Sequence, residues 1–477
     1  MQILNHKIIK QTLDKRFNKN EINTLKQLPK PFSLKDMDKA VDRIILAIQN
    51  NEKVLIVGDY DVDGTVSRVI LNEFFQHINF VADFITPDRF KDGYGISLPL
   101  IENTNANVII TVDNGINAYD VANFCKKNNI DLIITDHHTP SKPINAFCII
   151  NPKQADCPFI FKDICGAQVA WYLVAGLKSR LNISFDMSQL LDLLVMAIIA
   201  DVMPLVSINR VLVKKALKVF NNSSRASILA IKEVLGKMEF SSEDIAFLVA
   251  PKINVAGRVK NASLAIDFMC EKDIDKAIDK FKYLVSLIQQ RRELEEHIMK
   301  HADKQIDSND NVILIHKDTF HEGVIGIVAS QIANKYKKIS LVGTLNKQTN
   351  IIKMSARSYG QANLYDLIFS VKDNLLSFGG HREAAGLSVH KDNLTEFRKA
   401  LNVEFVKQNI SYKQDTLVMG ILPIDDINYD LLYLLEEYEP YGQANEKPRF
   451  LIENVVFIES KRVGEKKDCL KLTSRNK

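Results

Sequence analysis

Three aspartates at alternate positions follow an apolar run near the start of the sequence. Residues 54–57 are apolar and mostly β-branched, which predicts a buried strand, and Asp59, Asp61 and Asp63 come directly after it. An amphipathic run over residues 66–78 predicts a helix, so the acids would lie at the carboxyl end of a strand, where open α/β sheets bind ligands. Neighbouring carboxylates repel one another and lose hydration when they are buried. A divalent cation that prefers oxygen ligands, such as Mg²⁺, Mn²⁺ or Ca²⁺, would compensate for both effects.

The same spacing also opens the calcium-binding loop of an EF-hand, which needs an acidic residue at its twelfth position. Counted from Asp59, the twelfth residue is Ile70, and the preceding segment has the pattern of a strand rather than of a helix. The sequence therefore argues against an EF-hand. A solvated acidic turn is the alternative for this stretch taken alone.

Two further predicted strands and one predicted helix also end in residues that can bind metal. These residues are Asp113 after segment 108–112, Asp136, His137 and His138 after segment 132–135, and Asp201 after segment 188–200. Strand and helix signals alternate over this region, which predicts a parallel sheet covered by helices. Because the carboxyl ends of parallel strands meet at one edge, we expect about four carboxylates and one or two imidazoles in one cleft.

Such a cleft can hold two divalent ions, since each ion needs several protein ligands and one carboxylate can bridge both. A histidine ligand favours Mn²⁺ over Mg²⁺. Each motif alone has a simpler interpretation: the Asp-His-His tripeptide as surface residues, Asp113 as part of a turn, and Asp201 as a helix end. Their common position at successive element ends favours the metal site.

The remaining sequence predicts further units. Segment 273–306 has the pattern of one long helix whose apolar stripe ends half-way, which favours a bridge between two domains over an amphipathic helix in a single core. Segment 311–407 predicts a second α/β unit with a Gly-Gly-His turn, where His381 and Arg382 offer hydrogen-bond donors to a phosphate. Segment 410–477 predicts a short helix, a strand-like stretch over 451–463 and a basic tail from 460.

The length and composition limit the classes of protein to which this sequence can belong. The length of 477 residues predicts roughly two to four domains, and a hydrophobic content of 46% with 25% charged residues is ordinary for a globular protein. The six cysteines form no CxxC pair, which indicates reduced thiols rather than disulfides or zinc ligands. No signal peptide or membrane-spanning apolar run is present, so we expect a cytoplasmic protein without membrane contact. A net charge of +4 is too small to establish nucleic-acid binding, and the lack of a Walker A loop argues against ATP hydrolysis.

The order of these motifs resembles a known family. Four motifs of the DHH phosphoesterase superfamily are similar to GDYDVDG, TVDNG, DHH and IADVMPL, and the Gly-Gly-His motif of its associated DHHA1 domain is similar to SFGGHREAAGLSV. PDRFKDGYG, the NVAGR turn and the length resemble the RecJ family, whose members are single-strand-specific 5′→3′ exonucleases. The resemblance spans roughly residues 50 to 460.

The resemblance implies a role for each matching position. The positions that match metal ligands are Asp61, Asp63, Asp113, His137 and Asp201, with Asp59 as a further candidate. His138 matches the second histidine, which assists at the scissile phosphate. The positions that match substrate-binding residues are Arg89 near the 5′ end, Arg258 near the scissile phosphate, Ser355 and Arg357 at the 5′-phosphate, and His381 of the Gly-Gly-His motif.

The resemblance also implies an α/β fold with several domains. The expected order is an N-terminal lead (1–50), a parallel-sheet DHH catalytic domain (51–270), a connecting helix (271–308), a smaller α/β DHHA1 substrate-binding domain (309–408) and a partial OB-fold module (409–477).

Two features of the sequence depart from the family pattern. Its glycine-asparagine-proline run appears here as Gln443-Ala444-Asn445-Glu446, and the sequence leaves room for about two or three of the five OB strands, which suggests truncation.

The expected activity is hydrolysis of single-stranded DNA from the 5′ end to 5′-mononucleotides with two Mn²⁺ or Mg²⁺ ions, in recombination and repair. We expect a monomer, with a helicase or a single-strand-binding protein as a candidate partner. One alternative is a DHH phosphodiesterase for short oligonucleotides or cyclic dinucleotides, which would not need the context of Arg89, the long helix or the C-terminal extension. The other is a non-catalytic DHH scaffold that binds DNA, which should have lost some of the metal ligands, whereas this sequence keeps them all.

Overall fold

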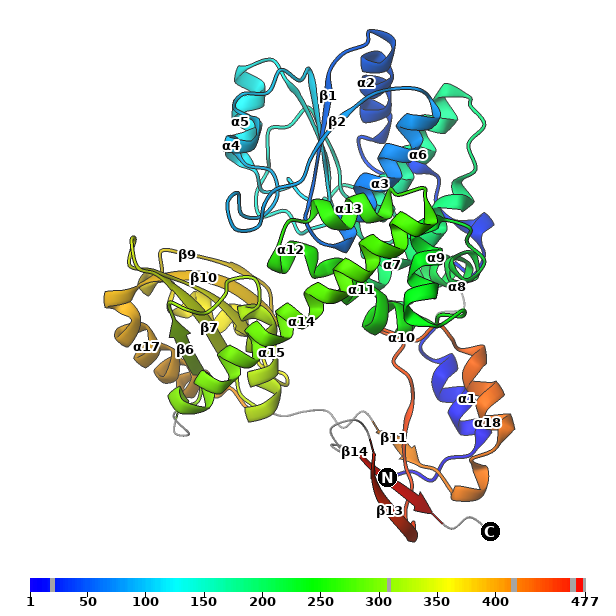
Figure 1. Ribbon diagram of the computed structural model, residues 1–477, viewed down its shortest axis with the longest axis vertical. Coiled ribbons are helices and arrows are strands. Elements are labelled where there is room, and N and C mark those ends of the chain that lie inside the picture. The colour runs from blue at the N-terminus through cyan, green and yellow to red at the C-terminus, as the bar shows by residue number, and fades with distance from the viewer. Residues whose placement is uncertain (18–21, 307–309, 413–417, 464–468, 475–477) are drawn as a thin grey trace.

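The computed structural model describes residues 1–17, 22–306, 310–412, 418–463 and 469–474. Two α/β units are joined by a long helix, and a smaller unit combines the first helix with the C-terminal segment (Figure 1). No helix in the described ranges is both long and apolar enough to cross a membrane.

The first unit contains a five-stranded parallel sheet with the strand order β2-β1-β3-β4-β5. Its strands are β1 (Val54–Gly58), β2 (Asp83–Ile85), β3 (Val108–Val112), β4 (Asp131–Thr135) and β5 (Cys148–Ile150). One face is covered by α2 (Met37–Gln49), α3 (Val62–His77) and α6 (Gly166–Leu181), the other by α4 (Leu98–Ile101) and α5 (Tyr119–Lys127) (Figure 1). Because both faces are covered, β1 and β3 are buried along their whole length, which explains their continuous apolar sequence. The predicted parallel sheet is confirmed.

A layer of helices lies beneath this sheet in the view of Figure 1. Its members are η3 (Met187–Leu190), α7 (Leu191–Ala200), α8 (Ser207–Asn221), α9 (Ala226–Leu235), α10 (Ser242–Asp244), the π-helix η4 (Ile245–Val249), α11 (Ala250–Asn254), α12 (Ala256–Val259) and α13 (Ser263–Met269). Helix α7 is apolar on nearly every side because it is buried in the core. Its last turn delivers Asp201 to the edge of the sheet.

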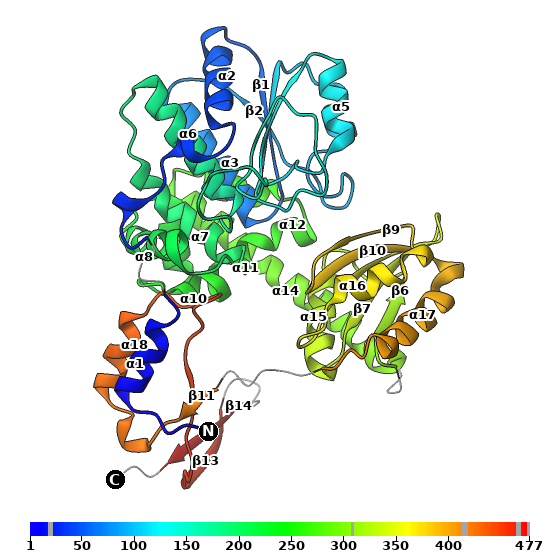
Figure 2. The same ribbon diagram turned by 180° about the vertical axis from the view of Figure 1, so that it is seen from behind.

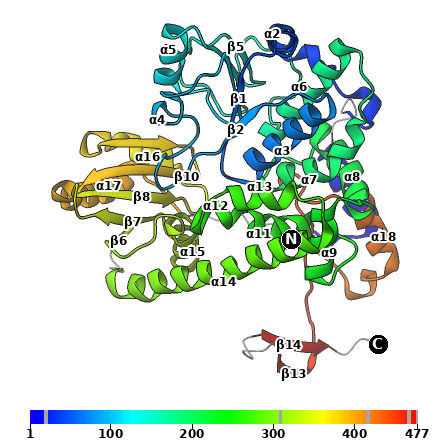
Figure 3. The ribbon, with the colours of Figure 1, turned by 45° about the horizontal axis from the view of Figure 1, so that its top comes forward.

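The 32-residue helix α14 (Ile274–Gln305) connects the two α/β units, and Figure 3 shows it along its length. Its first half buries Phe281 and Leu287 in the core of the first unit. Its second half buries Ile298 and Ala302 against α15 of the second unit. The predicted long bridging helix is therefore confirmed.

The second unit is a mixed five-stranded sheet with the order β6-β7-β8-β10-β9, in which only β6 and β7 are parallel. Its strands are β6 (Ile313–Lys317), β7 (Ser340–Asn346), β8 (Ile351–Arg357), β9 (Ser377–Gly380) and β10 (Ala384–His390). Helix α15 (Ile325–Tyr336) packs on one face, and α16 (Leu364–Ser370) and α17 (Leu394–Lys407) pack on the other. The sequence predicts a turn at Gly-Gly-His, whereas both glycines lie in β9 and the hairpin turn begins at His381.

The smaller unit brings the two ends of the sequence together. Helix α1 (His6–Asp14) buries Ile9 and Leu13 against α18 (Tyr429–Glu437), and the two helices lie side by side in Figures 1 and 2. The hydroxyl of Tyr438 donates to Asp14 Oδ1 at 2.6 Å. The first 50 residues, predicted as one lead, therefore divide between two units, since α2 packs on the first sheet.

The remaining strands of this unit form two separate two-stranded sheets. Parallel β11 (Val418–Ile421) and β12 (Arg449–Leu451) make one, and antiparallel β13 (Phe457–Val463) and β14 (Cys469–Ser474) make the other. The strand-like segment over 451–463 is thus split between β12 and β13. Residues 464–468 and 475–477 of the predicted basic tail lie outside the described residues.

Short 3₁₀-helices also occur in the loops of all three units: η1 (Leu25–Gln27), η2 (Pro31–Ser33), η5 (Lys372–Asn374), η6 (Lys391–Asn393) and η7 (Ile424–Asp426).

Candidate metal centre

The turn between β1 and α3 places the first three acids. Helix α3 begins at Val62, four residues before the predicted start, because Asp61 is its N-cap and accepts from the amide of Gly64 at 3.0 Å. Asp63 therefore lies in the first turn of the helix and is buried. A Cβ atom at Gly64 would come within 2.5 Å of the Asp59 carbonyl oxygen, so only glycine permits this turn.

The start of helix α6 supports Asp63 from the opposite side. The amide of Gly166 donates to Asp63 Oδ2 at 2.6 Å, and the amide of Ala167 donates to Asp63 Oδ1 at 2.8 Å. These two donors belong to the N-terminus of a 16-residue helix, whose dipole favours negative charge. Asp63 is thus held in one orientation without any cationic side chain.

Asp113 is positioned by its neighbour Asn114. The buried Asn114 amide donates to the carbonyls of Val57 and Val112 at 3.0 and 2.9 Å, which joins the ends of β1 and β3. Asp113 itself adopts a left-handed backbone conformation with φ of 62°. The segment is therefore both a turn and the support of a candidate ligand.

Asp136 orients the two histidines that follow it. Its buried carboxylate accepts from the amides of Ile116, His137 and His138 at 2.9, 2.7 and 3.0 Å. It also lies 2.7 Å from Nδ1 of His138. Asp136 supports the site rather than contributing a ligand, because its oxygens are already occupied by these donors.

The predicted ligands lie together at the edge of the first sheet. His137 Nε2 lies 3.2 Å from Asp113 Oδ1, 3.5 Å from Asp201 Oδ2 and 3.7 Å from Asp63 Oδ2. Three groups have ligand atoms within 4.8 Å of one another: Asp63 with His137 and Asp201, Asp59 with Asp61 and Asp113, and Asp113 with His137 and His138. All six candidate ligands thus belong to one continuous cluster.

The electrostatics of this cluster fit divalent cations. Burial and then repulsion by neighbouring carboxylates raise the pKa of Asp113 well above its usual range and that of Asp201 to about 9. Burial lowers the pKa of His137 to about 4, so its imidazole is neutral and able to act as a ligand. The buried polar atoms without a hydrogen-bond partner here are Asp59 Oδ1, Asp113 Oδ1, both nitrogens of His137 and Asp201 Oδ2. Bound cations would satisfy these atoms and compensate for the crowded negative charge.

His138 differs from His137 in its environment. Burial opposes its protonation, but the hydrogen bond with Asp136 and the negative charges of Asp136, Asp201 and Asp63 together outweigh burial and raise the pKa of His138 to about 9. The Tyr94 hydroxyl lies 3.3 Å from His138 Nε2 and donates to the carbonyl of Asp113 at 3.3 Å. The sequence reasoning missed Tyr94 because a tyrosine in a glycine-rich loop carries no signal of such contacts.

Four arginines from separate segments lie close to one another beside the cluster: Arg89, Arg258, Arg291 and Arg357. Burial and then the positive charges of Arg89 and Arg291 lower the pKa of Arg258 to about 10. The guanidinium of Arg89 stacks over the ring of Tyr60 at 4.9 Å. Because these positive charges repel one another, the arginine group would favour binding of an anionic ligand. Arg291 was not predicted, because its segment has the pattern of an ordinary charged helix.

The second unit contributes the other predicted substrate residues. Arg357 Nη1 donates to Ser355 Oγ at 2.9 Å and to the Ala356 carbonyl at 2.8 Å, at the end of β8. His381 lies at the turn of the β9–β10 hairpin with its side chain exposed, and its amide donates to the Ala384 carbonyl at 2.8 Å. Ser355 and Arg357 thus adjoin the arginine group, whereas the contacts of His381 are within its own hairpin.

Comparison with known proteins gives consecutive matches along the chain. Residues 53–198 match the DHH family N-terminal domain, residues 309–407 the DHHA1 domain and residues 420–477 the RecJ OB domain. The single-stranded-DNA-specific exonuclease RecJ of Bacillus subtilis is 31% identical, and the alignment covers 94% of this chain and 58% of that relative. RecJ of Haemophilus influenzae is 29% identical over 94% of this chain and 83% of the relative.

Solved structures with a similar fold agree with these sequence matches. RecJ from Thermus thermophilus in complex with Mn²⁺ superposes with a TM-score of 0.84 at 25% identity, covering 100% of this chain and 74% of that one. A second exonuclease RecJ bound to manganese gives a TM-score of 0.68 at 28% identity, over 78% of this chain and 95% of that one. The chain spans 58% of the length of its Bacillus relative and 74% of the Thermus structure.

Proposed function

We propose, on the premise that this chain belongs to the RecJ branch of the DHH phosphoesterase superfamily, that it is a metal-dependent exonuclease. It would shorten single-stranded DNA from the 5′ end and release 5′-mononucleotides. The premise rests on the consecutive DHH, DHHA1 and RecJ OB matches and on relatives that align over most of the chain. The observation that carries the proposal is the buried carboxylate and imidazole cluster, faced by arginines from both α/β units.

The cluster would hold two divalent ions, Mn²⁺ or Mg²⁺. Asp59, Asp61 and Asp113 form one set of ligand atoms, and Asp63, His137 and Asp201 form the other. Related RecJ structures contain Mn²⁺ or Mg²⁺. Bound ions would supply an acidic water and positive charge beside the scissile phosphodiester.

His138 acts on the phosphate from its position beside the ligands. With a pKa of about 9 it carries a proton at neutral pH, and Asp136 fixes its ring through Nδ1. Its Nε2–H can therefore donate to an oxygen of the scissile phosphate. This donor is prepared before substrate binds, so it needs no reorganisation during the reaction.

The arginines and the second unit hold the strand. Arg258 lies next to the cluster, where the scissile phosphate would lie, and Arg89 is fixed on Tyr60 near the 5′ end. Ser355 and Arg357 would bind the 5′-phosphate, and His381 would contact the nucleotide from the hairpin of the second unit. On this proposal residues 51–270 catalyse, 309–408 bind the nucleotide and 409–477 guide the strand, with 271–308 as the connection.

The cellular role we propose is recombination and repair of DNA by a monomeric enzyme. A helicase or a single-strand-binding protein would present the single strand. Such a partner is consistent with the substrate, because an exonuclease of this kind needs a free, unpaired 5′ end.

The proposal is tested by digestion of one single-stranded DNA oligonucleotide labelled either at the 5′ or at the 3′ end, with Mn²⁺ and with EDTA. We expect early release of a labelled mononucleotide from the 5′ label and a descending ladder from the 3′ label, both lost in EDTA. A ladder from the 5′ label would reverse the proposed direction. Cleavage of dinucleotides or cyclic dinucleotides with an intact oligonucleotide would instead assign the site to a small-substrate phosphodiesterase.

Replacing Arg357 with alanine should separate 5′-phosphorylated from 5′-hydroxyl substrates. Loss of a charge-assisted hydrogen bond to a phosphate costs about 1.5–3 kcal/mol, so KM for the phosphorylated oligonucleotide should rise about tenfold or more. KM for the 5′-hydroxyl oligonucleotide should change less than about twofold, since the lost partner is absent there. Lys335→Ala is the control, because Lys335 lies on α15 and pairs with Asp303 at 2.8 Å. Equal changes for both substrates would remove Arg357 from the 5′-phosphate site.

A further inference from the structure

One short segment of the second unit contacts the surroundings of each predicted substrate arginine. This inter-unit segment, residues 321–326, leads from the loop after β6 into the first turn of α15, and its residues are buried or partly buried. Arg89 and Arg258 belong to the first unit and Arg357 to the second, each in a separate part of the sequence. The segment therefore connects the two units at the predicted substrate site.

Gly323 of this segment packs against the main chain of the first unit. A Cβ atom at Gly323 would lie 1.8 Å from the Arg258 carbonyl oxygen, so only glycine permits this contact. The same helix α12 also approaches the turn between β1 and α3, where a Cβ atom at Gly257 would lie 2.8 Å from the Tyr60 carbonyl oxygen. Helix α12 thus contacts both the turn that carries the first candidate ligands and the second unit.

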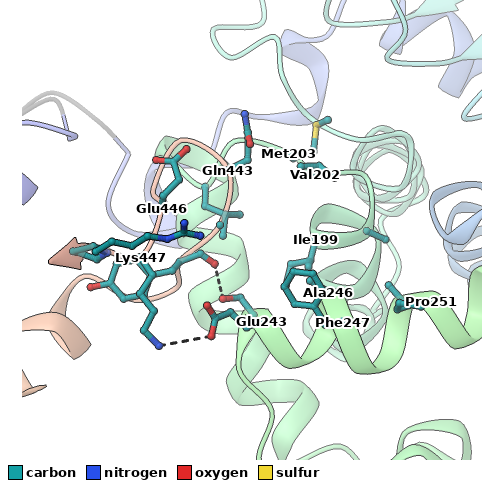
Figure 4. A pocket seen from close by; sticks show the side chains of 18 of the residues that line it. Ile199, Val202, Met203, Glu243, Ala246, Phe247, Pro251, Gln443, Glu446 and Lys447 are labelled. Atoms are coloured by element: carbon teal, nitrogen blue, oxygen red, sulfur yellow. Dashed lines mark hydrogen bonds and ion pairs between the residues drawn. The ribbon is translucent and has the colours of Figure 1, made fainter. Parts of the chain in front are cut away.

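The helices around α12 are not packed on every side. A cavity with a volume of about 1020 Å³ is lined by Arg258 of α12 and Pro251 of α11. Figure 4 shows Pro251 on one side of this cavity and Gln443 of the C-terminal loop on the other. Because α12 borders an open space there, its position depends on the contacts with Tyr60 and Gly323.

His321 makes a second contact between the segment and the first unit. Its ring lies edge-on to the ring of Phe90, with centroids 5.3 Å apart. The amide of Gly323 donates to His321 Nδ1 at 3.2 Å, which orients the imidazole. Phe90 directly follows Arg89 in the sequence, and its amide donates to Asp88 Oδ1 at 2.8 Å. The ring contact therefore holds the loop that carries Arg89.

The other end of the segment contacts the predicted 5′-phosphate site. A Cβ atom at Gly326 would lie 3.0 Å from both Ser355 Oγ and Arg357 Nη2, so the glycine leaves room for these two groups. Within six residues the segment thus contacts the backbone of Arg258, the loop of Arg89 and the side chain of Arg357.

We propose that residues 321–326 position the 5′-phosphate site of the second unit against the scissile-phosphate site of the first. His321 and Gly323 are positioning residues, which act through the three arginines rather than on the substrate. A strand whose 5′-phosphate is bound by Arg357 then also reaches Arg258, and two linked contacts bind more tightly than either alone. The inference rests on the proposed function and deepens it, since the preference for a 5′-phosphate then depends on the docking of the two units.

The test compares binding of two thymidine oligonucleotides, one with a 5′-phosphate and one with a 5′-hydroxyl, each with a fluorophore at the 3′ end. Fluorescence anisotropy in EDTA reports affinity without cleavage. The wild type should bind the phosphorylated strand about tenfold more tightly. Gly323→Ala should reduce this preference to about twofold or less, because the added methyl forces the two units apart by about 1 Å. Adding Gly323→Ala to Arg357→Ala should cause no further loss of preference.

The aromatic contact tests the same proposal in case Gly323→Ala does not fold. Phe90→Ala and His321→Ala should each lower the preference about two- to tenfold, the range for one aromatic pair, and the double variant should lower it no further. His321→Phe, which keeps a ring at this position, should restore the preference. The controls are Gly176→Ala on α6 and Phe369→Ala, whose ring stacks with Tyr365 of the same helix. Both controls should bind like the wild type.

The possible outcomes separate this inference from the proposed function. A wild type without preference for the 5′-phosphate would overturn the inference, as would Gly323→Ala or His321→Ala variants that keep the preference. Equal weakening of both strands would also overturn it, because it would indicate general damage to the binding surface rather than lost positioning. A wild type that shows the expected binding but does not cleave single strands when Mn²⁺ is added would overturn only the proposed function.

Discussion

Replacing Asp113 with asparagine is expected to abolish cleavage while making the metal-free protein more stable. Asparagine has the same shape and tolerates the left-handed backbone at this position, where φ is 62°. Loss of its charge removes a ligand shared by two of the three ligand groups. We expect the rate of single-strand cleavage to fall about 10³-fold, at the upper end of what loss of one electrostatic group in an active site causes.

The gain in stability follows from the repulsion in the empty cluster. Burial and the neighbouring carboxylates raise the pKa of Asp113, so the ionised form destabilises the folded state at neutral pH. The variant should therefore be more stable in EDTA by about 1 kcal/mol, as is common when a strained active-site group is removed. The difference should shrink as pH falls, because the wild-type carboxyl then takes up a proton in the folded state.

Three measurements check this prediction: the rate of cleavage, the urea midpoint in EDTA at several pH values, and the shift of that midpoint with Mn²⁺. Mn²⁺ should stabilise the wild type, by about 2.7 kcal/mol at a hundred times Kd, and stabilise the variant much less. Asp120→Asn is the control, since Asp120 is an exposed acid on α5. Retained activity, or equal stabilisation by Mn²⁺, would contradict the assignment of Asp113 as a ligand.

Replacing Gly166 with alanine should impair catalysis although Gly166 has no side chain. A Cβ atom at this position would lie 2.5 Å from Asp113 Cβ and 2.7 Å from Asp113 Oδ1. The added methyl must displace either Asp113 or the start of α6, whose amide donates to Asp63. A displacement of about 1 Å costs about 10²-fold in rate, so a loss of this size is expected.

Gly176→Ala on the same helix is the matched control. Its Cβ would meet Val41 and Met37 at 3.0 Å or more, far along α6 from the ligands. Both substitutions add one methyl group to a glycine of α6, so a difference between them in activity reports the position of Asp113. Rates of single-strand cleavage and Mn²⁺ affinities should be measured for both. If Gly166→Ala cleaves as fast as Gly176→Ala, the cluster is not as tightly constrained as its geometry indicates.

The candidate ligands could be predicted from the sequence because their signals are local. Buried parallel strands are short apolar runs, and chelating residues directly after such runs must meet at one edge of the sheet. Strand β3 and Asp113 at its end illustrate this, since the predicted and observed bounds of the strand coincide. The start of α3 was misplaced because a polar segment with a capping aspartate resembles a loop until the cap is seen.

Other features depend on contacts between distant segments. The pairing of α1 with α18 joins residues about 420 positions apart, such as Asp14 and Tyr438, and neither helix indicates its partner. The two glycines of the Gly-Gly-His motif lie in strand β9 because β10 offers them hydrogen bonds, whereas paired glycines alone favour a turn. From its position after a strand, Asp136 could be a metal ligand, but in the structure its carboxylate accepts from backbone amides.

The sequence by itself determined the parallel sheet, the edge at which the ligands gather and the chemistry of a divalent metal site, because strand periodicity and the order of polar residues are local properties. The tertiary structure decided where the arginines lie. Arg89, Arg258, Arg291 and Arg357 come from four segments, and Arg357 of the second unit joins the other three because α14 fixes the second unit against the first. Such positions depend on how rigid units pack, which no local pattern of residues encodes.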